Sequence, residues 1–267
     1  MNYEIRIPSL NLNFTVPPSK SVVHRELIIQ FLLRTFVVPE PVEGVEGVEG
    51  VEGPQPTDND DIRATRACLK ALYEATNDDS STDIIMPCNE SGSTLRFMIS
   101  VGAAYLTHMG LAGKKRLVFL PKGRLIERPL DQLVKCLGDH GVTVSVDKQN
   151  QKIYVQGALQ GGVFKIEGNV SSQYASGLQM ASLVIPGATV EIVGPMESKG
   201  YYELTLDLIK KYAGSSGALR PAQGPQGTEG DWSSAAFLLT LGAMTSDAHV
   251  ELSGLNKESF QKDKIIL

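Results

Sequence analysis

The stretch TVPPSKSVVHREL, residues 15 to 27, gathers hydroxyl groups and cations around one expected helix start. Two prolines end an extended segment, and Ser19, Lys20 and Ser21 then open an apolar-periodic segment that carries Arg25 in its first turns. Cations near a helix N-terminus oppose the helix dipole, so a purely structural design would place acids there. An anion bound between the cations and the backbone N–H groups removes this conflict.

Serine-rich helix starts recur at residues 91–93, 171–172 and 231–233, and the second start has Arg96 within its first turns. Any one of them has a simpler explanation, because serine and aspartate are common helix caps. The accompanying cations favour ligand binding: Arg124 and Arg128 lie in an expected loop after a strand, and Lys199 lies in MESKGYY. A Walker-type phosphate loop is absent from the sequence. The pattern therefore indicates a metal-free site for small phosphorylated or carboxylated molecules.

Composition excludes several other classes of protein. The 267 residues have a hydrophobic content of 42% and a formal net charge of −5, which supports a folded core and argues against general nucleic-acid binding. The three cysteines and four histidines show no metal-ligand spacing. The N-terminus lacks an apolar signal core, and the longest apolar run is too short to span a membrane. We expect a cytoplasmic protein with neither a metal nor an organic cofactor.

Short strands and helices alternate along the chain, which predicts an α/β fold built from a repeated unit. The expected strands are Leu117–Leu120, Val142–Val146, Ile153–Val155, Val163–Ile166, Val190–Val193 and Val250–Leu252. Helices are expected after each of the four serine-rich starts. Two segments without apolar periodicity interrupt the pattern: residues 39–56 repeat Val-Glu-Gly four times, and residues 214–228 are rich in Gly and Pro. We expect both to be mobile surface insertions.

Six motifs in register resemble those of 5-enolpyruvylshikimate-3-phosphate synthase, an enolpyruvyl transferase of the shikimate pathway. PPSKSVVHREL resembles S-K-S-x-x-x-R, NESGSTLRF resembles N-x-G-T-x-x-R, and GRLIERPLDQLV resembles R-x-x-E-R-P. NVSSQYASGLQMA is similar to S-S-Q, ESKGYYELTLDL to S-K-P-Y, and EGDWSSAAFLL to E-G-D-x-S-S. The resemblance covers nearly the whole chain, which makes it far more specific than any single short motif.

The resemblance implies a metal-free transfer of the enolpyruvyl group from phosphoenolpyruvate to the 5-hydroxyl of shikimate 3-phosphate, with release of phosphate. Cations would carry the phosphate and carboxylate charges, and positioning would supply much of the acceleration.

The resemblance also assigns residues to the two substrates. Contacts with shikimate 3-phosphate are expected from Lys20, Ser21, Arg25, Ser171, Ser172, Gln173, Ser198 and Tyr201. Contacts with phosphoenolpyruvate are expected from Lys20, Gly92, Arg128 and Gln173. Further candidates are Arg96, Arg124 and Lys199, of which Arg96 has the alternative role of tying neighbouring loops together.

The family fold is an inside-out α/β barrel of two similar domains, each built from repeated β-α-β-α-β-β units with helix N-termini facing a cleft. By this resemblance residues 19–228 form one complete substrate-binding domain, and residues 1–18 with 229–267 form part of the other. SFQKDKIIL resembles the start of a further family helix, so the family's acid/base residues are expected beyond Leu267. We therefore expect a truncated synthase that is inactive alone, a monomer by family but prone to self-association through apolar faces around Phe237 and Leu239.

Three residues depart from the family pattern. Glu90 stands where the family has asparagine and should weaken anion binding unless it is turned away or paired with Arg96 or Arg128. Gly200 replaces a proline beside Tyr201, and Trp232 replaces a small residue.

Two alternatives remain from the sequence. A non-catalytic half-enzyme could hold shikimate 3-phosphate in the complete domain without turnover. A UDP-N-acetylglucosamine enolpyruvyl transferase would share the fold, but Arg124 stands where that family has a cysteine, and that family's opening motif lacks S-K-S-x-x-x-R.

Overall fold

A computed structural model describes residues 10–36, 58–77, 80–213 and 229–266. The two expected insertions, 39–56 and 214–228, lie outside these ranges. The chain divides into two compact units: unit 1 is Met1–Val23 with Gln223–Leu267, and unit 2 is His24–Ala222. None of the helices in the described ranges is long and apolar enough to cross a membrane.

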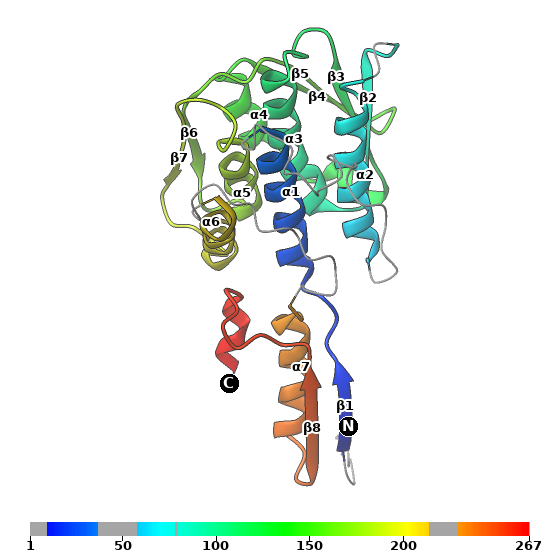
Figure 1. Ribbon diagram of the computed structural model, residues 1–267, viewed down its shortest axis with the longest axis vertical. Coiled ribbons are helices and arrows are strands. Elements are labelled where there is room, and N and C mark those ends of the chain that lie inside the picture. Colours follow the sequence, from blue (N-terminus) through cyan, green and yellow to red (C-terminus); the bar gives the residue numbers. More distant parts are fainter. Residues whose placement is uncertain (1–9, 37–57, 78–79, 214–228, 267) are drawn as a thin grey trace, which may run out of the picture. The chain divides into compact units, whose positions relative to one another are not determined.

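Unit 2 contains the larger part of the secondary structure (Figure 1). It begins within the first turns of the first helix, α1 (Lys20–Phe36). Its other helices are α2 (Asp60–Glu74), α3 (Gly92–His108), the short 3-10 helix η1 (Gly123–Glu127), α4 (Asp131–Gly138), α5 (Ser172–Ala181) and α6 (Lys199–Ala213). Its strands are β2 (Asp83–Asn89), β3 (Arg116–Pro121), β4 (Val142–Asp147), β5 (Lys152–Gly157), β6 (Gly162–Glu167) and β7 (Ala188–Val193).

Parallel strand pairs set the architecture of unit 2. A four-stranded sheet has the order β2-β3-β5-β4, in which β2 and β3 are parallel and the other neighbours are antiparallel. Strands β6 and β7 form a separate parallel pair. Parallel strands need a crossover, and helices α3 and α5 provide it in the two pairs. Each crossover helix therefore begins at the carboxyl end of a strand, where the serine-rich motifs lie.

Helix α3 forms the centre of the unit 2 core. Its side chains are buried almost without interruption from Thr94 to Leu106, as expected for a helix that is apolar around its whole circumference. Glycine allows α5 to approach it closely, because a Cβ atom on Gly177 would lie 3.0 Å from the carbonyl oxygen of Arg96. The start of α5 is thereby fixed against the start of α3.

Unit 1 has a small core. Strand β1 (Leu10–Thr15) pairs in parallel with β8 (Ala248–Ser253), and the unit adds α7 (Trp232–Ala243) and the 3-10 helix η3 (Lys262–Ile266). Its buried residues Val16, Trp232 and Ala235 pack against Leu239, Leu252 and Leu255. Phe237 on α7 is 79% exposed and Met244 is 81% exposed. The outer face of α7 is therefore apolar and uncovered by the described residues of unit 1.

The six strands and four helix starts predicted from the sequence are confirmed. The prediction of a loop is wrong for Arg124, because two backbone bonds of i→i+3 type, Leu125 N to Lys122 O and Arg128 N to Leu125 O, wind residues 123–127 into η1. Arg128 follows η1 with extended backbone, in agreement with the predicted loop. No prediction was made for helices α2, α4 and α6 or for strand β2.

Candidate anion-binding site

The start of α3 lies at the carboxyl ends of the parallel strands β2 and β3. The two strand ends are joined by a backbone hydrogen bond from Lys122 N to Asn89 O of 2.7 Å. Ser91 then caps α3, and its Oγ accepts from the Thr94 backbone N–H at 3.2 Å. Ligands of α/β proteins commonly bind at this end of parallel strands, where helix N–H groups point outward.

Two guanidinium groups flank Gly92 at this helix start. A Cβ atom on Gly92 would lie 3.4 Å from Nη1 of Arg96 and 3.7 Å from Nη1 of Arg128. Within the described ranges, neither arginine forms an ion pair with a carboxylate. Two like charges at the positive end of a helix dipole are unfavourable, and an anion between them would relieve that cost. The start of α3 is therefore a candidate anion-binding site.

Gln173 connects Arg96 to α5. Arg96 Nη1 donates to Gln173 Oε1 at 2.7 Å, and Gln173 Nε2 donates to Ser93 Oγ at 3.0 Å. The Arg96 guanidinium also lies 5.7 Å from the ring centre of Tyr174, whose hydroxyl donates to the Pro129 carbonyl. Arg96 Nε is buried without a hydrogen-bond partner in the described part of the chain. Arg96 therefore ties α3 to α5, the alternative role considered from the sequence, while remaining beside Gly92.

The predicted phosphate serines lie at the carboxyl ends of the second parallel pair. The loops after β6 and β7 are bonded to each other through Gly168 N to Val193 O and Glu197 N to Gly168 O. Ser171 caps α5 and accepts from Gln173 N at 3.3 Å, and Ser172 is buried as the first residue of that helix. Ser198 is exposed and has a positive φ of 53° immediately before α6. Both helix starts of this pair thus carry serine hydroxyls at adjacent loops.

Arg25 on α1 is hydrogen-bonded to a buried residue of α6. Its Nε donates to Thr205 Oγ1 at 2.7 Å, and its guanidinium carbon lies 5.0 Å from the Phe97 ring centre and 6.0 Å from that of Tyr201. Arg25 is only 3% exposed, whereas Tyr201 is 42% exposed. Burial lowers the pKa of Arg25 to about 10, so it stays charged at neutral pH.

Lys20 and Ser21 fall in unit 1 and are described apart from the others. They begin α1, directly after the buried Ser19, whose Oγ donates to Asp231 Oδ1 at 3.1 Å. The Ser19 backbone N–H donates to the Glu229 carbonyl at 3.0 Å, so the two segments of unit 1 are hydrogen-bonded where α1 starts.

Three charged side chains near the unit 2 helix starts are directed elsewhere. Arg124 is 93% exposed and pairs with Glu127 at 3.1 Å, and Lys199 is 70% exposed and pairs with Glu203 at 3.3 Å. Glu90 lies against the η1 backbone, since a Cβ atom on Gly123 would be 3.1 Å from its Oε1. It pairs with neither Arg96 nor Arg128 among the described residues, which leaves both guanidiniums without a neutralising carboxylate.

A buried chain of hydroxyl groups behind the α3 cap escaped the sequence analysis. His24 Nδ1 contacts Thr65 Oγ1, Thr65 contacts Thr94 Oγ1, and Thr94 donates to Ser91 Oγ, each at 2.7 Å. The residues come from α1, α2 and the start of α3, so this series of hydrogen bonds links three helices and fixes the Ser91 hydroxyl that caps α3. The sequence offered no signal for it, because threonine and histidine on helices have no distinctive spacing.

Within the described ranges, the cysteines are buried and no cluster of metal-binding side chains is found. Within the described ranges, no group of three or more histidine, cysteine or acidic residues could hold a metal ion. Cys68, Cys88 and Cys136 are free and buried. Burial raises the pKa of Cys88 to about 12 and that of Cys136 to about 11, which keeps both thiols protonated and unreactive at neutral pH.

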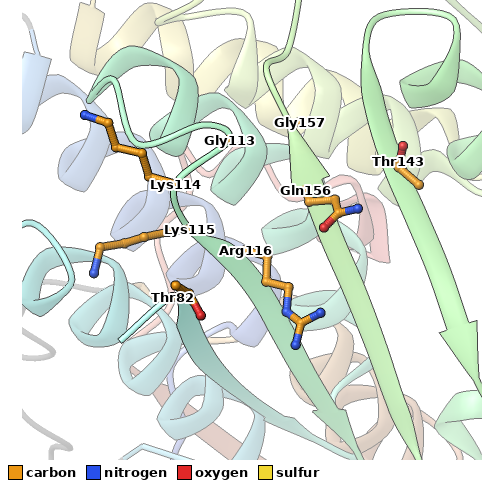
Figure 2. A pocket seen from close by; sticks show the side chains of 8 residues that line it. All are labelled: Thr82, Gly113, Lys114, Lys115, Arg116, Thr143, Gln156 and Gly157. Carbon is orange, nitrogen blue, oxygen red and sulfur yellow. The ribbon is translucent and has the colours of Figure 1, made fainter. Parts of the chain in front are cut away.

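A basic hollow of about 640 Å³ lies at the opposite ends of β2 and β3 (Figure 2). Two of its three cations are already engaged: Arg116 Nε pairs with Asp83 Oδ1 at 2.6 Å, and Lys115 Nζ donates to the Ser81 carbonyl at 2.8 Å. Figure 2 shows Lys114 and Lys115 extending away from Thr143 rather than converging on one point. The hollow therefore lacks the convergent donors found around Gly92.

These features define a mixed α/β protein with a candidate anion site at the carboxyl ends of its parallel strands. The sequence profile of the EPSP synthase (3-phosphoshikimate 1-carboxyvinyltransferase) family matches residues 6–267. The chain belongs to this family.

Individual relatives agree with the family assignment. The 3-phosphoshikimate 1-carboxyvinyltransferase of Clostridium perfringens is 32% identical over 263 residues, covering 93% of this chain and 59% of the relative. That of Clostridium beijerinckii is 30% identical and covers 100% of this chain and 63% of the relative. An EPSP synthase structure from Acinetobacter baumannii has a TM-score of 0.55 at 19% identity, over 94% of this chain and 57% of that one. The chain thus spans about three-fifths of the length of the curated relatives it matches.

Proposed function

We propose that this chain provides the shikimate 3-phosphate half-site and part of the phosphoenolpyruvate site of an EPSP synthase. The observation that carries the proposal is the pair of guanidiniums beside Gly92, neither of which has a carboxylate partner in the described ranges. Family membership supplies the substrate class. In the family reaction the 5-hydroxyl of shikimate 3-phosphate adds to the enol carbon of phosphoenolpyruvate, the methylene gains a proton, and phosphate then leaves.

Shikimate 3-phosphate is assigned to the α5 and α6 starts. The hydroxyls of Ser171, Ser172 and Ser198 would donate to the 3-phosphate, helped by backbone N–H groups at the two helix N-termini. Arg25 would pair with the carboxylate, and Tyr201 would close over the ring. Because Arg25 is 3% exposed, this contact requires neighbouring side chains to shift when the ligand enters. We also assign Lys20 and Ser21 to substrate contact, on the motif resemblance alone.

Phosphoenolpyruvate is assigned to the α3 start. Arg128 would clamp one of its anionic groups bidentately, and Gly92 would let the ligand approach the backbone closely. Gln173 would bridge the two ligands, and its bonds to Arg96 and Ser93 support a role beside the phosphoenolpyruvate site. We expect Arg96 to add charge at the same position, and Arg124 and Lys199 to contribute little because they are exposed and paired.

The finer fold expectation is retained as a proposal. The element order β2-α3-β3-α4-β4-β5 in unit 2 supports the repeated β-α-β-α-β-β unit of the family barrel. The discontinuous unit 1, with its small core and apolar outer face, supports the interpretation of a partial second domain, although its bounds, Met1–Val23 and Gln223–Leu267, include Lys20 and Ser21, which the boundaries expected at residues 18 and 229 exclude. We propose that the 267-residue chain binds ligand but does not turn it over alone, and that its apolar α7 face promotes self-association.

Calorimetric titration tests this function. The chain should bind shikimate 3-phosphate at one saturable site, shikimate far more weakly, and UDP-N-acetylglucosamine not at all. A Ser198→Ala variant should bind shikimate 3-phosphate more weakly by about tenfold, because it loses a donor to a charged group. Tight binding of UDP-N-acetylglucosamine would instead support the other enolpyruvyl transferase. Failure of a folded chain to bind either ligand would refute the half-site proposal.

A further inference from the structure

The hydroxyl of Thr205 lies where three helices of unit 2 meet. Thr205 on α6 and Ser176 on α5 are both 0% exposed, and Arg25 on α1 is 3% exposed. Their side chains contact one another directly, although Arg25 and Thr205 are 180 residues apart in the chain. A buried polar contact of this kind is costly to break, because water cannot replace the lost partner.

The hydrogen bonds of Thr205 aim its acceptor at Arg25. The single hydroxyl proton has two acceptors in reach, Ser176 Oγ at 2.8 Å and the Tyr201 carbonyl at 3.1 Å. With the proton directed to those oxygens, a lone pair of Oγ1 remains for the Nε–H of Arg25, which lies at 2.7 Å. The orientation of the Thr205 hydroxyl is thus determined by α5 and α6, and it fixes one edge of the guanidinium.

Aromatic rings restrain the guanidinium further. Phe97 on α3 lies 5.0 Å from the guanidinium carbon, and Tyr201 lies 6.0 Å from it. A planar group held at one nitrogen and packed against a ring has little freedom to rotate. Arg25 is therefore preorganised before any ligand arrives, and preorganisation reduces the entropy lost on binding.

We infer that Thr205 is a positioning residue, which holds the Arg25 guanidinium in the orientation that receives the carboxylate of shikimate 3-phosphate. This inference rests on the proposed function for the identity of the ligand. Thr205 accepts from Arg25 Nε, so the inferred contact with the carboxylate would be made by Nη1 and Nη2 of the same guanidinium. When neighbouring side chains shift to admit the ligand, the bond to Thr205 would keep the Arg25 guanidinium in the same orientation.

The test compares Thr205→Val, which keeps the shape and removes the hydroxyl, with Thr205→Ser, which restores the hydroxyl. Thr107→Val is the matched control, because Thr107 also bonds a carbonyl four residues earlier and accepts a buried backbone N–H, from Leu159. Thr107→Val should leave the affinity for shikimate 3-phosphate unchanged. Thr205→Val should weaken it by about tenfold, and Thr205→Ser should restore it to within about twofold.

A nuclear magnetic resonance readout separates the inference from the proposed function. The Nε–H signal of Arg25, identified by its loss in Arg25→Lys, should be protected from solvent exchange in the wild type and in Thr205→Ser. It should lose that protection in Thr205→Val, with or without ligand. If the wild type binds no shikimate 3-phosphate but the signal depends on Thr205 in this way, the proposed function fails and the positioning of Arg25 by Thr205 stands.

Two results would overturn the inference. One is a Thr205→Val chain that is folded by its melting profile and binds shikimate 3-phosphate as tightly as the wild type. The other is an Arg25 Nε–H signal that is equally protected from solvent exchange in the wild type and in Thr205→Val. If Thr205→Val does not fold, Ser176→Ala decides, because it removes an acceptor that orients the Thr205 hydroxyl. It should weaken binding and Nε–H protection to a smaller extent, and no change in either would count against the inference.

Discussion

Replacing Gly177 by alanine tests how closely α5 packs against α3. The added Cβ atom would lie 3.0 Å from the Arg96 carbonyl oxygen and 3.2 Å from the Phe97 Cα atom, and both are backbone atoms that cannot change rotamer. Overpacking of this kind costs about 1–3 kcal/mol, whereas alanine in a helix interior gains about 1 kcal/mol over glycine. We therefore expect Gly177→Ala to lower the free energy of unfolding by up to about 2 kcal/mol, the difference between these two terms.

Gly138→Ala is the matched control, because Gly138 is also helical and nothing lies within 4 Å of its added Cβ atom. That variant should be as stable as the wild type or more stable, by up to about 1 kcal/mol. Denaturant titration followed by far-ultraviolet circular dichroism reports mainly on unit 2, which holds most of the helices, while fluorescence of the single tryptophan, Trp232, reports on unit 1. A Gly177→Ala variant as stable as Gly138→Ala would refute the close helix contact that aligns the starts of α3 and α5.

Three further predictions concern the site, the thiols and the surface. Arg128→Gln should weaken phosphoenolpyruvate binding by at least about tenfold in calorimetry, whereas Arg124→Gln should not, because Arg124 is 93% exposed. Burial raises the pKa of Cys88 from 9.0 to about 12. Between these pH values the thiol is therefore protonated in the folded chain and ionised in the unfolded chain. The stability that this proton contributes is present below pH 9 and lost toward pH 12, by about 1.4 kcal/mol per pH unit; in denaturant titrations Cys88→Ala should reduce the downward slope by that amount, while the other buried thiols keep their own contributions. Phe237→Ser should reduce self-association in sedimentation velocity with little change in stability, since Phe237 is 79% exposed; unchanged association would exclude the α7 face.

The sequence predicted the parts of the fold that depend on local signals. Caps such as Ser91, Ser171 and Asp231 act within three residues along the chain, so each could be recognised without knowing the fold. Helix α2 also carried a local signal that the analysis overlooked, since Asn59 caps it and Asp60 and Asp61 follow in its first turn. Strand β2 was obscured by a proline at position 87.

The contacts that shape the site depend on pairings that no local pattern encodes. Arg96 and Gln173 are 77 residues apart, and their bond exists because Gly177 lets α5 approach α3. The orientation of Glu90 toward Gly123 likewise follows from the fold of η1, which the sequence analysis took for a loop. Motif resemblance identified which residues to consider, but only the fold shows that Arg96 and Arg128 flank Gly92 while Arg124 points to solvent.

The most direct test of the half-site proposal is a crystal structure of this chain with shikimate 3-phosphate. The proposal predicts that the 3-phosphate lies within hydrogen-bond distance of the hydroxyls of Ser171, Ser172 and Ser198, and that the carboxylate pairs with Arg25. Ligand bound instead in the basic hollow beside Lys114 and Arg116, with the serines uncontacted, would contradict it.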